Sequence, residues 1–239
     1  MDKKKEVSTK STKDDLLDFI CKELVPTTAT VLKSEKEDWI DRISRAAQTS
    51  RRDGIAKAII GEIKQMRDDG KIPNEYLSTP QAQECLGELF DALANDAPDE
   101  KYLIALKKIF AKAASKENMD EWLSERPQQL MRICRKLNGD ELTILSACFH
   151  YRKRMKMTGN DDYPEISSAE QWPNAVAKDS NNALTPGIVD HYEENLINMK
   201  LIGGRNHADR SEIQRSQDFR LTPLGIELCE FIDEPSTLP

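Results

Sequence analysis

Histidine and carboxylate side chains supply most metal-binding and acid-base groups in proteins, and this chain holds three histidines. His191 and Glu194 stand three residues apart, with Asp190 beside them, so a helix would present two metal ligands on one face. We favour a solvated helix face with Tyr192 and Leu196 turned inward, because no third group of ligands is visible in the sequence. The sequence therefore predicts no bound metal and no cofactor.

A thiol and an imidazole also occur close together. Cys148 and His150 would be the nucleophile and the base of a thiol enzyme if the fold brought them into contact. The simpler interpretation, which we favour, is that His150 lies at the edge of the core with its hydrogen-bonding groups satisfied. Patterns for phosphate loops (GxxxxGKS or GxxxxGKT), serine nucleophiles (GxSxG) and zinc proteases (HExxH) do not occur. These observations predict a protein that is not an enzyme.

The cysteines show no spacing typical of zinc sites or disulfide frameworks. They lie far apart without a CxxC pair, and each falls among apolar residues at helical spacing. We expect buried, reduced thiols at all five positions: Cys21, Cys85, Cys134, Cys148 and Cys229.

The composition is that of a helical and heavily solvated protein. Of 239 residues, 38% are hydrophobic, 32% are charged and 6% are aromatic, which argues against a β-sandwich. No run approaches the roughly 18 consecutive apolar residues of a membrane helix. The start, Met1 to Lys5, lacks the apolar stretch of a signal peptide. We therefore expect a cytoplasmic protein.

Negative charge is concentrated in the C-terminal part of the chain. Residues 139–239 hold 10 Lys and Arg against 17 Asp and Glu, while residues 1–138 hold 25 of each kind. The net charge of −7 thus arises wholly after residue 138. A general nucleic-acid binder would carry a basic surface to neutralise phosphates, and this balance indicates none.

The first half of the chain predicts a disordered tail (1–13) followed by a helical bundle (14–138). The tail holds almost nothing apolar, whereas the apolar spacing after it is helical almost throughout. Start signals at Ser34-x-x-Glu37, Ser78-Thr79-Pro80 and Pro98-Asp99-Glu100, and a stop signal at 68–73, separate the helices. From residue 55 onward we expect these side chains to be buried: Ile55, Ile59, Ile63, Met66; Leu86, Leu89, Phe90, Leu93, Ala94; Tyr102, Leu103, Leu106, Ile109, Phe110, Ala113; Leu130, Ile133, Cys134 and Leu137.

Residues 139–234 predict a different architecture, because extended segments interrupt the helices. Leu142, Leu145, Cys148 and Phe149 mark the inner face of one helix. Ser168-x-x-Gln171 is the capping box of a short helix, and Thr185-Pro186 starts a longer one. Leu201 and Ile202, a polar tip (205–216) and an extended piece (219–221) lead to a last helix after Thr222-Pro223. Helix, helix, helix, strand, wing, strand, helix is the winged-helix order. The predicted fold class is mainly α: a helical bundle, then a winged-helix-like module with a small β-hairpin (139–234) and a short tail (235–239).

Several phrases carry a resemblance to known proteins: Ile72-Pro73-Asn74-Glu75, Ala97-Pro98-Asp99-Glu100, Ile109-Phe110-Ala111-Lys112, Leu130-Met131-Arg132-Ile133, Leu137-Asn138-Gly139-Asp140-Glu141, Asn195 through Ile202, and Arg220-Leu221-Thr222-Pro223-Leu224-Gly225. Together these phrases resemble the middle and the end of the Abi-alpha family, a bacterial family linked by name to abortive infection. The resemblance covers residues 70 to 232. It implies a helical domain followed by a winged helix and a role in phage defence, and it implies no catalytic residues.

Seven basic residues would be the candidate phosphate contacts if the winged helix bound duplex DNA: Arg152, Lys153, Arg154, Arg205, Arg210, Arg215 and Arg220. The expected reading helix, however, carries Asp190, Glu193 and Glu194, which would repel phosphate. For the first three cations we favour charges that match a helix dipole, and for the four arginines a solvated hairpin.

We therefore expect a non-enzymatic protein-interaction or regulatory component that binds a protein partner or itself and no membrane, with phage defence as its setting. A DNA-binding transcriptional regulator that uses the winged helix is the alternative.

Overall fold

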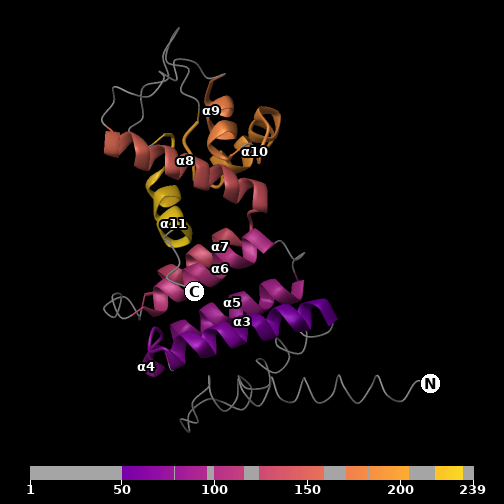
Figure 1. Cartoon of the computed structure of the whole chain (residues 1–239), viewed down its shortest axis with the longest axis vertical. Helices are drawn as coiled ribbons and strands as arrows, with labels where there is room; N and C mark the ends of the chain where they lie inside the picture. Colours follow the sequence, from indigo (N-terminus) through magenta and orange to yellow (C-terminus); the bar gives the residue numbers. More distant parts are fainter. Residues whose placement is uncertain are drawn as a thin grey trace, which may run out of the picture. The chain divides into compact units, whose positions relative to one another are not determined.

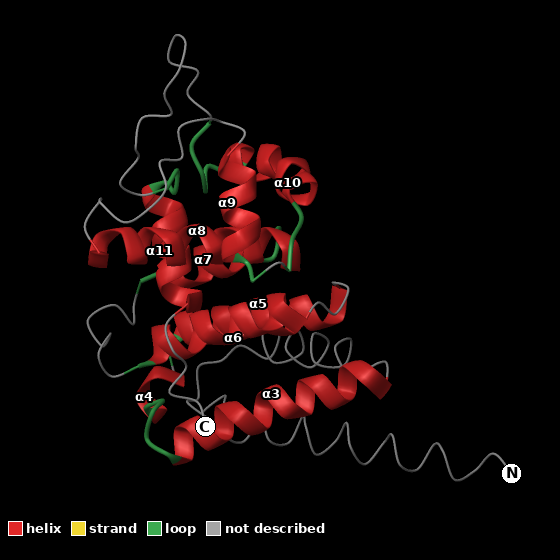
Figure 2. Cartoon of the chain, turned by 45° about the horizontal axis from the view of Figure 1, so that its top comes forward, coloured by secondary structure: helices red, strands yellow, loops and turns green. Residues whose placement is uncertain are grey.

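The computed structural model describes residues 50–77, 79–95, 100–115, 124–158, 171–181, 183–204 and 219–233. Within these ranges the chain is mainly helical and contains no strand (Figure 2). The expected mainly α class is therefore confirmed for this part of the chain. The tail (1–13), the helices expected before residue 50 and the C-terminal tail (235–239) lie outside the described residues.

The chain divides into two compact units, one ending at Lys136 and the other beginning at Leu137, whereas the sequence argument put the boundary after residue 138. In the first unit (Figure 1) the structure describes α3 (Ser50–Asp68), α4 (Asn74–Leu77), α5 (Pro80–Asn95), α6 (Glu100–Ala114) and α7 (Arg126–Cys134). Helices α5, α6 and α7 pack against one another, and α3 and α4 pack on α5. The side chains expected in the core are buried wherever they are described, except for half-buried Ile133.

The end of α3 shows why the stop signal at 68–73 is effective. Gly70 has a φ of +69°, which glycine adopts without a steric penalty. The Gly70 N–H donates to the Arg67 carbonyl, and the Lys71 N–H donates to the Met66 carbonyl, both at 2.8 Å. These bonds satisfy the last carbonyls of the helix, as in a Schellman motif. The chain then turns into α4, a short helix that the sequence argument did not predict.

Three ion pairs join helical segments of the N-terminal unit to one another. The carboxylate of Glu62 on α3 pairs with Lys107 on α6. Glu88 on α5, 9% exposed, accepts from Arg132 Nε at 2.6 Å and from Arg135 Nη1 at 2.7 Å. Burial raises the pKa of Glu88, but the hydrogen bonds and charges of the two arginines outweigh it, so the pKa lies below its ordinary value.

In the C-terminal unit, α8 (Gly139–Thr158) packs against α9 (Gln171–Asp179), α10 (Pro186–Asn198) and α11 (Pro223–Asp233). Helices α9 and α10 also pack on each other. The four side chains predicted on the inner face of α8, Leu142, Leu145, Cys148 and Phe149, are all buried. The expected helix starts at residues 186 and 223 are confirmed as well, whereas the expected cap at Ser168 lies outside the described residues.

The start of α8 is a capping box, in which a side chain and a backbone group satisfy each other reciprocally. The Asn138 side-chain oxygen accepts from the N–H groups of Asp140 and Glu141 at 3.0 and 2.9 Å. In return, the Glu141 carboxylate accepts from the Asn138 N–H at 2.8 Å. The same carboxylate accepts from the Asn195 side chain at 2.5 Å and so joins α8 to α10.

The expected β-hairpin is not confirmed: the described residues contain no strand, and one isolated antiparallel bridge joins Ile202 to Leu221. The Gly203 N–H donates to the Arg220 carbonyl at 2.7 Å, and the Thr222 N–H donates to the Leu201 carbonyl at 3.1 Å. The extended piece predicted at 219–221 is wrong for its first two residues. Phe219 and Arg220 have φ values of +50° and +69°, so the chain turns here instead of extending. Both side chains are buried. The polar tip (205–216) lies outside the described residues.

The start of α11 explains the phrase Leu221-Thr222-Pro223-Leu224-Gly225 in physical terms. The Thr222 hydroxyl accepts from the Gly225 N–H at 3.1 Å, which caps the helix, and it donates to the Lys200 carbonyl at 2.6 Å. Pro223 occupies the first helical position, where its missing N–H costs nothing. A Cβ at Gly225 would lie 2.1 Å from the Leu201 carbonyl oxygen, so only glycine fits there. Residues 221–225 thus form the motif that joins the start of α11 to the end of α10.

Candidate functional site

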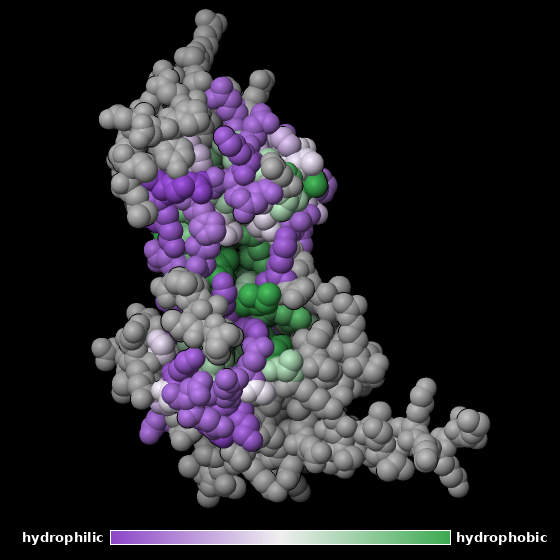
Figure 3. Space-filling view, in the orientation of Figure 1, coloured by the Kyte–Doolittle hydropathy of each residue, from purple (hydrophilic) through white to green (hydrophobic). Residues whose placement is uncertain are grey.

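Helix α10, the expected reading helix, presents an acidic face to solvent. Thr185 begins it, accepting from the Ile188 N–H at 3.4 Å through its hydroxyl. Asp190, His191 and Glu194 are exposed. On the face shown in Figure 3, the described surface of the C-terminal unit is predominantly hydrophilic. The α10 surface that meets solvent therefore carries two carboxylates.

The candidate metal ligands lie on this face. His191 packs the edge of its ring on Tyr192, with ring centroids 4.8 Å apart. Tyr192, expected to turn inward, is half-buried, whereas Leu196 is buried as expected. The part of the chain that the structure describes contains no group of three histidine, cysteine or carboxylate side chains placed to hold a metal ion.

Glu193 does not belong to the exposed face, so the expectation that it would repel phosphate together with Asp190 and Glu194 is wrong for this residue. Its side chain is buried, 7% exposed, and its Oε1 accepts from Arg220 Nη2 at 2.6 Å. The spacing of the helix held a signal for this, since Val189, Glu193 and Leu196 follow the i, i+4, i+7 pattern of one buried face. A carboxylate at such a position requires a buried cationic partner.

That partner is Arg220, which is itself 7% exposed. Besides Glu193, its guanidinium contacts the Gly203 carbonyl through Nε at 3.0 Å and Nη2 at 2.7 Å. The guanidinium also lies over the Trp172 ring, 4.3 Å from the ring centroid. Neither a phosphate contact nor the solvated hairpin position that we favoured describes this residue. It ties α9, α10 and the bridge together.

The neighbouring Phe219 completes an aromatic layer. Its ring stacks on Tyr151 of α8 at 4.0 Å between centroids and 20° between planes, and it lies 6.4 Å from the Trp172 ring. We name Phe219 and Arg220 the corner, because both have left-handed backbones. A left-handed conformation costs a residue with a Cβ roughly 1–2 kcal/mol. The stack and the ion pair offset this cost, as expected for strained residues that the surrounding structure holds in place.

The basic cluster at the end of α8 is engaged within the C-terminal unit. Lys153 Nζ lies 3.2 Å from the Asp233 carboxylate and 4.4 Å from the centroid of the Phe149 ring. Arg154 pairs with Asp179 of α9. Arg152 lies 5.9 Å from the centroid of Phe149. Ion pairs and ring contacts, rather than the helix dipole alone, therefore account for this cluster.

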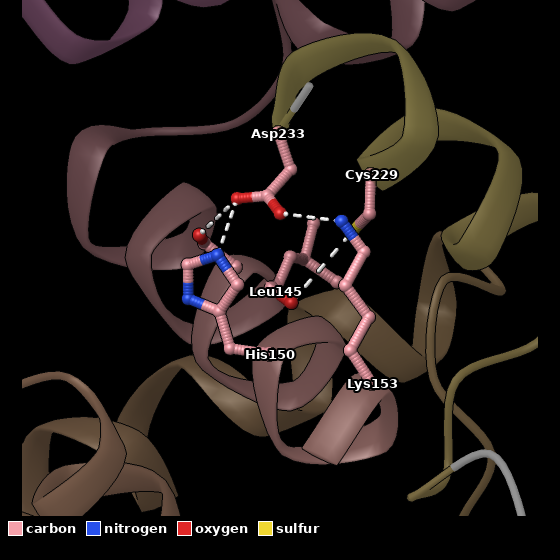
Figure 4. Close-up of polar contacts among 6 residues, drawn as sticks. Leu145, His150, Lys153, Cys229 and Asp233 are labelled. Carbon is pink, nitrogen blue, oxygen red and sulfur yellow. Dashed lines mark hydrogen bonds and ion pairs between the residues drawn. The ribbon is translucent and has the colours of Figure 1, made fainter. Parts of the chain in front are cut away.

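The carboxylate of Asp233, at the end of α11, forms hydrogen bonds and ion pairs with several side chains of α8 (Figure 4). His150 Nε2 lies 2.7 Å from one carboxylate oxygen, and the Ser146 hydroxyl lies 3.3 Å from the same oxygen. Lys153 approaches the other oxygen. His150 is therefore satisfied at the edge of the core, in agreement with the interpretation made from the sequence.

Cys148 and His150 lie two positions apart on α8, a spacing at which helix side chains do not face each other. Cys148 is fully buried, and burial raises the pKa of its thiol to about 12. Burial also raises the pKa of Cys85 and of Cys134 to about 12, and that of Cys229 well above its ordinary value. All four are free, buried thiols, as expected, and Cys21 lies outside the described residues. Thiols with such pKa values are poor nucleophiles at neutral pH.

Three of the seven candidate phosphate contacts, Arg205, Arg210 and Arg215, lie outside the described residues. No described helix is long and apolar enough to cross a membrane. In the comparisons with known proteins, no family model, no curated protein and no solved structure matches the chain. The similarity to the Abi-alpha family thus rests on the phrases quoted from the sequence.

Proposed function

We propose that this protein is a non-enzymatic regulatory component whose C-terminal unit docks a protein partner through the exposed face of α10. One observation on the described residues carries the proposal. Lys153, Arg154 and Arg220 are paired with carboxylates of their own unit, and the exposed side chains of α10 include the carboxylates of Asp190 and Glu194. A phosphate backbone would have to displace the carboxylates that pair with these cations. It would also have to approach the carboxylates of Asp190 and Glu194. The surface therefore favours a partner that brings its own donors or positive charge.

Two further observations support a role without catalysis. The Cys148 thiol is fully buried and its pKa is raised, whereas the His150 side chain is exposed and contacts Asp233, so the two do not form a nucleophile–base pair. The resemblance to the Abi-alpha family supports phage defence as the setting of the proposed docking. The winged-helix order of the C-terminal unit stays part of this proposal, since winged helices serve as protein-docking modules as well as DNA readers.

A DNA-binding titration tests the proposal against its alternative. We expect no salt-sensitive binding of duplex DNA to the wild-type chain near physiological ionic strength, measured by fluorescence anisotropy. Replacing Asp190 and Glu194 with glutamine removes the repelling charges and leaves the buried Glu193 intact. Wild-type binding that rises in this variant and disappears when Arg205, Arg210 and Arg215 become alanine would make the protein a DNA-binding regulator.

Site-specific photocrosslinking in cells tests the docking itself. A photoreactive residue at His191, on the exposed face of α10, should form one defined protein adduct. The matched control is Lys178, which is exposed on α9 of the same unit and should form none. Charge reversal of Asp190 and Glu194 to lysine should abolish the adduct at 191. Equal adducts from both positions, or an adduct that survives charge reversal, would contradict docking through this face.

A further inference from the structure

The corner, Phe219 and Arg220, is an unusual place to find two adjacent left-handed residues, because neither is glycine. Its side chains contact three different helices: Tyr151 of α8, Trp172 of α9 and Glu193 of α10. Its backbone is also engaged, since the Arg220 carbonyl accepts from the Gly203 N–H at 2.7 Å. Contacts from several elements thus hold a backbone that would relax if they were released.

We propose that the corner is a strained latch with two states, closed as in this structure and open with a relaxed, extended backbone. The Arg220–Glu193 ion pair keeps it closed. Strained residues held by such contacts occur in switch regions. When one contact is lost, the strained backbone relaxes, and this relaxation favours the second state. A bistable element of this kind responds to any partner that competes for one member of the pair. The inference does not depend on the docking role proposed above.

Opening changes what the C-terminal unit shows to a partner. In the closed state Phe219 and Arg220 are 6% and 7% exposed. In the open state both side chains reach the surface, and an aromatic residue next to an arginine is a combination enriched at binding hot spots. The Gly203 N–H then loses its acceptor, which makes this amide a local reporter of opening. The Leu145 amide, in the middle of α8, reports unfolding of the unit as a whole.

Two variants at one position separate the strain from the ion pair. Arg220→Ala and Arg220→Gly both remove the guanidinium, but only alanine retains the left-handed penalty. At an ordinary position glycine is the more flexible residue and lowers protection from exchange. At Arg220 we expect the reverse order. The Gly203 amide should exchange about tenfold faster in Arg220→Ala than in Arg220→Gly, which corresponds to about 1.4 kcal/mol.

The matched control is Arg154, which also pairs with a carboxylate but lies within α8. In Arg154→Ala, the Gly203 amide should be protected from exchange at least as well as in Arg154→Gly. Glu193→Gln serves as a milder variant that decides the question if the Arg220 variants do not fold. It should accelerate exchange at Gly203 by about tenfold or more and leave Leu145 unchanged, since about 1.4 kcal/mol gives that factor.

Hydrogen exchange of the full chain, resolved by residue, gives a clear decision. The latch is supported if Gly203 exchange rises alone and the order at Arg220 is alanine faster than glycine. It is refuted if glycine exchanges as fast as alanine at that position. It is also refuted if Gly203 and Leu145 accelerate together in Glu193→Gln, because Arg220 then only stabilises the unit, or if Gly203 does not respond at all.

Discussion

Gly225→Ala should be among the most destabilising single substitutions in the C-terminal unit. The added Cβ would lie 2.1 Å from the Leu201 carbonyl oxygen, 3.0 Å from its carbonyl carbon and 3.3 Å from Leu221 Cδ2. Two of these three atoms belong to the backbone, so they cannot move aside as the end of a side chain would. Helix α11 must shift away from the end of α10 to make room.

The size of the effect follows from what this shift breaks. Overpacking in a close contact costs about 1–3 kcal/mol. Moving Thr222 away weakens its bonds to the carbonyls of Leu201 and Lys200, now 3.1 and 2.6 Å long, each worth about 1 kcal/mol. Alanine is about 1 kcal/mol better than glycine in a helix and offsets part of the loss. We therefore expect a net decrease in the free energy of unfolding of about 3 kcal/mol.

Urea denaturation followed by far-UV circular dichroism measures this decrease. Gly187→Ala is the matched control, since Gly187 also lies in the first turn of a helix and nothing stands within 4 Å of the position of its Cβ. That substitution should leave stability unchanged or raise it by up to about 1 kcal/mol. If Gly225→Ala is as mild as Gly187→Ala, the close approach of α11 to Leu201 is not a feature of the folded protein.

The remaining predictions concern a helix end and an ion pair. Lys200 is exposed and has a φ of +58° after α10, so Lys200→Gly should raise the free energy of unfolding by about 1 kcal/mol, whereas Lys200→Ala should not. Glu88→Gln should cost about 1–3 kcal/mol at neutral pH, because two arginines lose their charged acceptor. Since the folded pKa of Glu88 is depressed, its contribution is complete above the unfolded pKa and is lost as pH falls through the folded pKa. The stability difference between the wild type and Glu88→Gln, measured by urea titration at several pH values, should therefore shrink below about pH 4.3. A difference that stays constant down to the acid limit would contradict the pairing.

Local patterns predicted the helices well, because the interactions that begin and end a helix join residues close in sequence. Asn138 caps α8 through bonds to Asp140 and Glu141, and the N–H groups of Gly70 and Lys71 end α3 by donating to carbonyls three and five residues back. Apolar spacing identified the buried faces of α6 and α8 for the same reason. The short α4 was missed, since four residues are too few to show a helical period.

The candidate site was harder to predict, because its contacts join distant residues. Glu193 and Arg220 are 27 residues apart, and each looks like a surface charge when read alone. The sequence argument assigned the basic cluster on α8 to the helix dipole, whereas in the fold Lys153 and Arg154 pair with Asp233 and Asp179, which lie far along the chain.

The sequence by itself determined the mainly helical class of the described chain, the starts of α8, α10 and α11, and the buried thiols, since helix periodicity and capping are local. Only the tertiary structure decided which charges are consumed internally and that Phe219 and Arg220 turn instead of extending. The physical reason is that a buried ion pair and a ring stack are stable enough to override local backbone preference. Their strength depends on burial and on the approach of groups from α8, α9 and α10, which no stretch of sequence specifies alone.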